Sequence, residues 1–254
     1  MKVVLAVATA LLLLAIAVAA TAPATLADAR VSALSGGRLR IAAAAGTLWN
    51  GSGDLVMLPR GTRRAMAWHI DAWPLFVGEL RGTLRTGGGE ALPAEFSAGP
   101  ASNTLRRFDL SLPMESLLQT AGVPGAIATA GGVVSAHVER LVQTPGAIEA
   151  NLALQWQDAT VPTLQPGLRI ALGDVRCDVQ GTGREIEGAL SNRGGDVEIA
   201  GRVALTASLA PRIDATIRPR AGLDRDRTAA IASALSLVAA PDGHGGFRLA
   251  WSGS

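Results

Sequence analysis

The fold is decided by an alternation of apolar and polar residues that is clearest over residues 148–156, IEANLALQW. Every second side chain in this stretch is apolar, and most of the side chains between them are polar. A period of two is typical of a β-strand with one face on a core and the other in water. The same alternation recurs at residues 175–180, 202–209, 212–218 and 247–251. The chain beyond about residue 38 is therefore predicted to be all-β.

Glycine-rich breaks separate these alternating segments. They lie at residues 87–89, 131–132, 194–195 and 245–246. Short breaks between strands that have one polar face are typical of antiparallel strands joined by tight turns. The prediction is an antiparallel meander that forms a curved sheet, a sandwich or a partly closed barrel, and the alternation leaves these three alternatives open.

Two stretches depart from the alternation and predict helices. Residues 113–122 begin with a proline, carry an early carboxylate and end at a glycine, which predicts a short helix. Residues 224–240 carry acids early and are followed by a proline, which predicts a longer helix. Its apolar residues Ile231, Leu235 and Val238 recur at helical spacing. We expect this apolar stripe to pack against the sheet.

The amino-terminal segment predicts passage into or across a membrane. Residues 3–20 carry no charge, and this length nearly matches the roughly 20 residues that a helix needs to cross a bilayer. A cleaved secretory signal is one interpretation, because Ala27-Asp28-Ala29 offers a small-residue cleavage site. A retained anchor is the other, because the apolar run is longer than the usual signal core of roughly 7–15 residues. We expect residues 1–22 to be a retained transmembrane anchor.

The rest of the chain is predicted to be exported. Its length allows one large β domain or two small ones. We find no low-complexity linker between two domains, and the best internal candidate, Pro93 to Pro100, is predicted to be a loop. The predicted organisation is a juxtamembrane linker over residues 23–37 and a periplasmic β-rich domain over residues 38–254.

Composition excludes several classes of protein. The 254 residues carry 23 Lys and Arg against 21 Asp and Glu, a net charge of +2, and only 4% aromatic residues with no tyrosine. A nucleic-acid protein usually gathers its basic residues on one face and interleaves aromatic side chains for stacking, so nucleic acid is not an expected partner. The single cysteine, Cys177, excludes an internal disulfide and a four-thiolate metal site.

Few residues are candidates for catalysis or metal binding. His69 and Asp71 lie two apart in a predicted strand, as do His137 and Glu139, so each pair shares a face and could hold a metal or form a base with its orienting partner. Both pairs alternate with apolar residues and are better explained as the solvent face. Of the remaining candidates, His244 lies in a glycine-rich turn and Cys177 is expected to be a buried apolar residue.

No nucleophile-elbow, phosphate-loop or metalloprotease motif is present. We therefore predict no catalytic, cofactor-binding or metal-binding residues, no cofactor and no enzyme activity.

Two segments combine tryptophan, glycine and turn residues. They are residues 45–53, AGTLWNGSG, and residues 68–80, WHIDAWPLFVGEL. Trp49 is expected to fill the core beside glycines that let the backbone turn. Trp73 precedes a proline and is expected to be extended, with residues 75–77 forming a buried corner.

With these two segments the chain resembles the type II secretion system protein N family, also called general secretion pathway protein N, of Gram-negative bacteria. The resemblance rests on the membrane segment, on residues 46–51 and 68–80, on a Trp-x-x-Ala element at Trp156, and on the helix and final strand over residues 235–253. It implies a single-pass inner-membrane protein with a β-rich periplasmic domain that belongs to the secretion machinery. No catalytic residues come with the family.

The leading hypothesis is therefore an interaction protein that docks or assembles with other type II secretion subunits at the inner membrane, with no small-molecule substrate. The alternative is a periplasmic β protein that handles a lipid or another apolar ligand, because small residues such as Ala42 to Ala45 leave room for a groove. The two differ in whether the apolar strand faces pack together or line an open channel. A hydrolase would require at least two of His69, Asp71, His137 and Glu139 to converge in a cleft.

Overall fold

The computed structural model describes residues 21–58, 61–87, 92–120, 129–163 and 167–252. The chain divides into two compact units, unit 1 (Met1–Pro93) and unit 2 (Ala94–Ser254). Among the described residues, no helix has the length and apolar character needed to cross a membrane. Residues 1–20, most of the predicted anchor, lie outside the described residues.

Unit 1 is an antiparallel sheet with a helix on one face. Its strands pair in chain order, each with the next. The elements are α2 (Thr25–Leu34), β1 (Leu39–Gly46), β2 (Asn50–Met57), β3 (Thr62–Asp71), the 3₁₀ helix η1 (Trp73–Val77) and β4 (Leu80–Thr86).

Helix α2 was not predicted from the sequence, which assigned residues 23–37 to a linker. Ala24, Ile41 and Trp68 form the buried core of unit 1, and Ala27 and Val31 of α2 pack against it. The apolar side of α2 is built from small residues, so its pattern is weak in the sequence even though it covers the sheet.

Residues 75–77 were predicted to form a buried corner, and this prediction is wrong because the segment is exposed. Trp73, Phe76 and Val77 are 82%, 80% and 76% exposed. Trp73 is also not extended before its proline, because it is the first residue of η1. Proline is tolerated in the first turn of a helix, so Pro74 starts this turn instead of preventing it.

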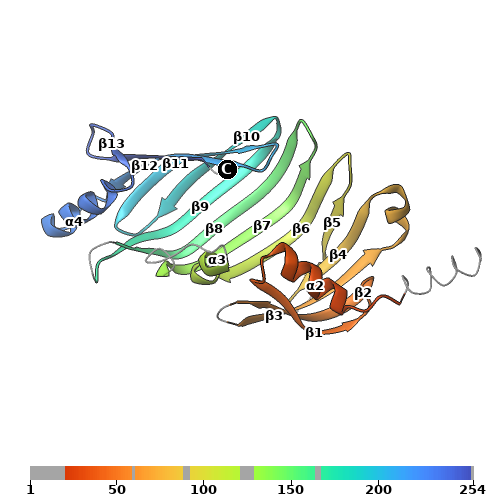
Figure 1. The fold of residues 1–254 in the computed structure, drawn as a ribbon. Helices are drawn as coiled ribbons and strands as arrows, with labels where there is room; N and C mark the ends of the chain where they lie inside the picture. Colours follow the sequence, from red (N-terminus) through yellow and green to blue (C-terminus); the bar gives the residue numbers. More distant parts are fainter. Residues whose placement is uncertain (1–20, 59–60, 88–91, 121–128, 164–166, 253–254) are drawn as a thin grey trace, which may run out of the picture. The chain divides into compact units, whose positions relative to one another are not determined.

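Unit 2 contains the larger sheet. Its strands lie side by side in chain order from β5 to β12, followed by β14 and then β13 (Figure 1). The elements are β5 (Ala94–Ala98), β6 (Asn103–Pro113), α3 (Met114–Thr120), β7 (Gly131–Gln143), β8 (Ile148–Pro162), β9 (Arg169–Gly183), β10 (Glu185–Arg193), β11 (Val197–Thr206), β12 (Pro211–Pro219), α4 (Arg225–Leu235), β13 (Ala240–Pro241) and β14 (Phe247–Ser252). The predicted all-β antiparallel meander is confirmed.

The sheet does not close into a barrel. Within each unit the described strands form one open sheet with consecutive antiparallel pairing. In unit 2 the amide of Gln143, at the end of β7, donates a hydrogen bond of 2.8 Å to the carbonyl of Ala207, beyond β11. Because β7 and β11 are four places apart in the sheet, this contact shows that the sheet is curved. Of the three predicted alternatives, the structure therefore supports the open curved sheet.

Two apolar clusters form the core of unit 2. The first joins Ile231 and Leu235 of α4 to buried residues of β9, β11 and β12, namely Ile170, Val197, Ile199 and Ala215. The second lies over β8, β9 and β10 and contains Ile148, Ala150, Cys177, Val179 and Ile186. The core face of this sheet is thus filled partly by α4 and partly by its own side chains.

Both helices predicted in unit 2 are present, and α4 is shorter than expected. It begins after Asp224, whose side chain accepts a hydrogen bond from the backbone N–H of Arg227, and it ends at Leu235. Val238, predicted to join the apolar stripe, is exposed. The helix ends early because residues 240–241 pair with β14, and the residue before a proline favours an extended backbone.

Two further local predictions are wrong. The expected loop from Pro93 to Pro100 contains strand β5, and this segment also holds the boundary between the two units. Residues 131–132 do not separate strands, because they begin β7 beside an irregularity in its pairing with β8. The breaks at residues 194–195 and 245–246 lie between strands, as predicted.

Candidate functional site

The two tryptophan-containing segments of the sequence meet in unit 1. Gly51 of β2 lies opposite Trp68 of β3, and the Trp68 indole N–H donates a hydrogen bond of 3.0 Å to the Leu48 carbonyl. A Cβ atom on Gly51 would lie only 2.4 Å from the Trp68 ring, so only glycine leaves room for it. Trp68, 6% exposed, is the core tryptophan, whereas Trp49 is only half-buried.

A carboxylate on α2 holds this helix to the sheet. Asp28 accepts two hydrogen bonds from the Arg40 guanidinium, at 3.0 and 2.8 Å, and one from the backbone N–H of Ile41 at 2.7 Å. The Arg40 hydrogen bond, helped by the Ile41 N–H, lowers the pKa of the Asp28 carboxyl. The predicted cleavage motif Ala27-Asp28-Ala29 is therefore part of a folded helix that is bonded to β1.

The histidine pairs lie on exposed strand surface. In unit 1, His69 Nε2 lies 3.3 Å from the Asp71 carboxylate, and both side chains are half exposed or more. In unit 2, His137 contacts Asp109 of β6, while Glu139 accepts a hydrogen bond from Asn151. The predicted solvent-facing positions agree with this exposure. His69 contacts Asp71, whereas His137 and Glu139 each contact a residue on a neighbouring strand and not each other.

His244 lies in the predicted turn between β13 and β14. The Asp242 carboxylate accepts hydrogen bonds from the backbone N–H groups of His244 and Gly246, at 2.7 and 2.8 Å. These two bonds are the main reason that the pKa of Asp242 is lowered, with a further contribution from Arg218. The geometry is that of a stabilised turn.

Cys177 is buried in the second apolar cluster of unit 2. Burial raises the pKa of its thiol, with a smaller effect from Asp178, so the reactive thiolate is disfavoured. Within the part of the chain that the structure describes, no group of three or more His, Cys, Asp and Glu side chains could hold a metal ion.

The surface of unit 2 opposite its core carries charged and amide side chains, and we call it the polar face. Arginines on this face are matched by nearby carboxylates. The pairs are Arg176–Asp178, Arg202–Glu187, Arg212–Glu185 and Arg248–Asp214. Exposed pairs of this kind stabilise a protein little, but they offer both donors and acceptors to a partner.

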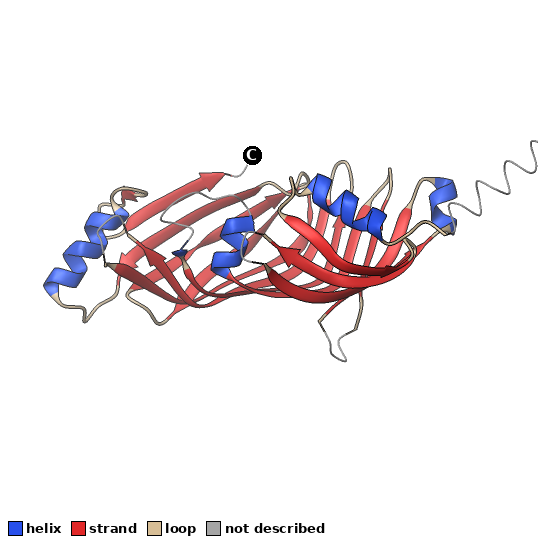
Figure 2. Cartoon of the chain, turned by 60° about the horizontal axis from the view of Figure 1, so that its bottom comes forward, coloured by secondary structure: helices blue, strands red, loops and turns tan. Residues whose placement is uncertain are grey.

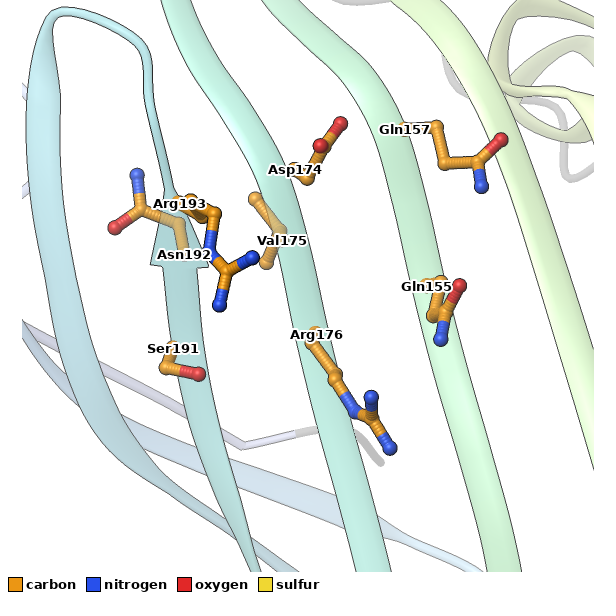
Figure 3. A pocket seen from close by; sticks show the side chains of 8 residues that line it. All are labelled: Gln155, Gln157, Asp174, Val175, Arg176, Ser191, Asn192 and Arg193. Carbon is orange, nitrogen blue, oxygen red and sulfur yellow. The ribbon is translucent and has the colours of Figure 1, made fainter.

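A groove of about 350 Å³ lies over β8, β9 and β10. It is lined by Gln155, Gln157, Asp174, Val175, Arg176, Ser191, Asn192 and Arg193 (Figure 3). The Asp174 carboxylate accepts a hydrogen bond from the Asp158 N–H, and Arg176 donates one to Asp178 at 2.6 Å. The amides of Gln155 and Gln157 stand on one strand, beside these charges on the next. Such a groove suits the backbone or polar side chains of a protein segment.

A second groove, of about 450 Å³, lies over β10, β11, β12 and β14. Its lining includes Glu187, Arg202, Arg212 and Asp214. Oppositely charged side chains on neighbouring strands offer both donors and acceptors to a partner. Sequence reasoning identified polar strand faces but neither groove, because each groove depends on which residues lie opposite one another across three or more strands.

Comparison with known proteins identifies one family. No curated protein and no solved structure matches the chain. The family described as Type II secretion system (T2SS), protein N matches residues 37–250, most of the chain. This family is a structural component of the type II secretion machinery and is not a known enzyme family. The chain therefore belongs to the type II secretion system protein N family, as the order and spacing of its tryptophan segments indicated.

Proposed function

We propose that this protein is a non-enzymatic component of the type II secretion machinery that is anchored in the inner membrane by residues 1–22 and docks with other subunits through its β units in the periplasm. The observation that carries the proposal is the family match over residues 37–250. A tethered module meets its membrane partners at a raised effective concentration, so docking needs only modest intrinsic affinity.

The packing of residues 22–28 supports retention of the amino-terminal segment. The Ala22 carbonyl accepts a hydrogen bond from the Leu48 N–H at 2.8 Å, Pro23 pairs with Thr47, and Ala24 is 2% exposed. Cleavage after Ala29 would remove all three residues and the Asp28 contacts from unit 1. Proteolysis at that site would therefore damage the fold, which argues for a retained anchor.

The polar face supports docking as its mode of action. Its two grooves lie on a sheet, a rigid support, and their side chains combine amides and ion pairs. Complementary charges and amides specify the partner and its orientation more than they raise affinity.

In-cell photo-crosslinking tests this assignment. A photoreactive amino acid at Gln155, Gln157 or Ser191 of the full chain is expected to capture other subunits of the secretion machinery. The matched control is Ser236, an exposed residue just after α4 and outside both grooves. Equal capture from Ser236, or no subunit captured from the groove positions, would contradict docking through the polar face.

The intact mass of the protein extracted from membranes tests the anchor. Retention of residues 1–22 is expected, together with extraction by detergent and not by high salt. A mature protein that lacks this segment would refute the anchor while leaving the docking surface to be judged by the crosslinks.

The handling of an apolar ligand remains a second candidate because of one feature of the core face. Leu154, which lies opposite Cys177, is 39% exposed although clusters on the same face are buried. Against this, side chains such as Val197 and Ile231 are fully buried in the sheet-to-helix packing. Native mass spectrometry of the detergent-extracted protein would reveal a lipid at fixed stoichiometry, beyond the variable lipids that surround an anchor, only if the second candidate is correct.

A further inference from the structure

A five-residue turn of unit 1 exposes its apolar side chains. Trp73, Phe76 and Val77 of η1 are each more than three-quarters exposed, and no residue from Trp73 to Val77 carries a charge. We call these five residues the aromatic turn. Soluble proteins rarely expose neighbouring large apolar side chains without a partner.

The aromatic turn is held in one shape before any partner arrives. The N–H groups of Gly78 and Glu79 donate hydrogen bonds of 3.0 Å to the carbonyls of Leu75 and Pro74. In a 3₁₀ helix the side chains at positions i and i+3 lie above one another. The rings of Trp73 and Phe76 accordingly contact each other, with centroids 5.5 Å apart and planes tilted by 55°. A preformed pair of rings loses little conformational entropy on binding.

The aromatic turn lies at the end of unit 1 where the chain enters from residues 1–20. The Leu48 N–H donates to the Ala22 carbonyl at 2.8 Å, and the Ile70 N–H donates to the Trp49 carbonyl at 2.6 Å. Two hydrogen bonds thus connect the entering chain, through the β1–β2 turn, to the end of β3 just before Trp73. Figure 2 shows η1 and the beginning of the described chain at the same end of the unit-1 sheet.

One arginine, Arg81, lies near both carboxylates that flank the aromatic turn, because it pairs with Glu79 and lies opposite Asp71. Glu79 pairs with Arg81 at 2.8 Å, and this hydrogen bond lowers the pKa of the Glu79 carboxyl. On the other side, Asp71 lies 3.3 Å from His69. The Arg81 guanidinium offsets part of the negative charge beside the uncharged rings, which reduces repulsion between the turn and a lipid headgroup layer.

We propose that the aromatic turn inserts into the interfacial layer of the same bilayer that residues 1–22 cross, as a second membrane contact of unit 1. Tryptophan and other amphipathic aromatic side chains favour the headgroup level of a bilayer. The inference rests on the anchor in the proposed function, because Ala22, which follows the uncharged run of residues 3–20 in the sequence, lies at this end of unit 1. Two contacts, the anchor and the turn, fix the orientation of unit 1 on the membrane surface.

Spin labelling of the full chain tests the inference. In a Cys177→Ala background, a nitroxide is attached at Phe76→Cys and the protein is reconstituted in vesicles of phosphatidylethanolamine and phosphatidylglycerol. The matched control is Arg63→Cys, an exposed position toward the opposite end of β3. The Phe76 label is expected to collide several-fold more with oxygen, which dissolves in lipid, and less with a water-soluble nickel complex than the Arg63 label does.

A third label separates failure of the turn from failure of the anchor. The third label is attached at Leu12→Cys. If the Leu12 label lies in lipid while the Phe76 label collides with the nickel complex as often as the Arg63 label does, the anchor is correct and the inference is wrong. A Leu12 label in water overturns the anchor and the inference together. Shielding of the Phe76 label from both reagents would mean that protein covers the turn, which also overturns the inference.

Discussion

In unit 1 a carboxylate on the helix reaches the sheet, whereas in unit 2 a carboxylate in a turn between two strands reaches the helix. Asp28 of α2 binds Arg40 and the Ile41 N–H of β1. Asp196, in the turn before β11, binds Arg227 of α4 at 2.5 Å and accepts the Ala171 N–H of β9 at 2.8 Å. In both units one shielded carboxylate joins a guanidinium to a strand N–H. This arrangement fixes a short helix over an open sheet, whether the helix carries the carboxylate, as α2 does, or the guanidinium, as α4 does.

The cores under the two helices differ more than their attachments. Unit 1 depends on one ring, Trp68, which lies across Gly51. Unit 2 depends on many aliphatic side chains, of which Ile148, Val197 and Ile231 are almost completely buried. A core centred on one large ring is more sensitive to a single substitution than a core that spreads its burial over many residues.

The substitution Trp68→Ala is expected to have the largest effect. It should lower the free energy of unfolding of unit 1 by about 3–5 kcal/mol, because it removes a buried ring and leaves a cavity. The exposed Trp73→Ala is the control and should change stability by less than about 0.5 kcal/mol. Hydrogen exchange should rise in α2 and in β1 to β4 but not in unit 2, and an equal rise in unit 2 would show that the two cores do not respond separately.

The substitution Gly51→Ala tests the ring from the opposite strand. The added methyl group would overlap the Trp68 ring, so we expect a loss of about 1–3 kcal/mol in chemical denaturation. Gly146→Ala is the matched control, since a Cβ atom there meets nothing within 4 Å. Similar effects of the two substitutions would mean that Trp68 does not require the glycine.

The substitution Asp28→Asn tests the attachment of α2. Hydrogen bonds to a charged group contribute about 1.5 kcal/mol, and a loss of this size is expected near neutral pH. Because the folded state lowers the pKa of Asp28, its contribution is present above the unfolded value of about 3.9 and is lost as pH falls through the folded value. The stability difference between the native protein and the variant should therefore shrink on acidification below about pH 4. A difference that stays constant would contradict the role of the charge.

The substitution Asp224→Ala should have the smallest effect, about 1 kcal/mol, through loss of the cap of α4. Asp226→Ala, in the first turn but outside the capping position, is the control and should cost less. Helix α2 has no side-chain cap at Ala24, so its stability depends on packing and on Asp28 instead. Equal effects at Asp224 and Asp226 would show that charge near the helix start, and not the cap, stabilises α4.

The strands and α4 could be predicted because each leaves its own signal in the local sequence. The alternation at residues 148–156 reports the two faces of β8 directly, and Asp224 with Ile231 and Leu235 reports a capped helix with one buried side. Helix α2 lacked such a signal, since its buried side consists mainly of alanine.

The surface features could not be predicted in the same way. Trp73 and Phe76 are apolar in sequence, and their exposure follows from their place in a turn beyond the end of β3. The grooves depend on the register of β8, β9 and β10, which no single strand encodes. The close approach of Gly51 to Trp68 likewise appears only when two strands are paired.

Strand β13 limits how the protein can associate with copies of itself. It pairs with Arg248 and Phe247 of β14, and Pro241 has no amide hydrogen to offer to a further strand. Of the residues that the structure describes on this edge, an incoming strand finds Leu249 to Ser252 of β14 unpaired, a length too short for a lasting ladder. This edge of the unit 2 sheet is therefore protected against pairing with a strand of another molecule.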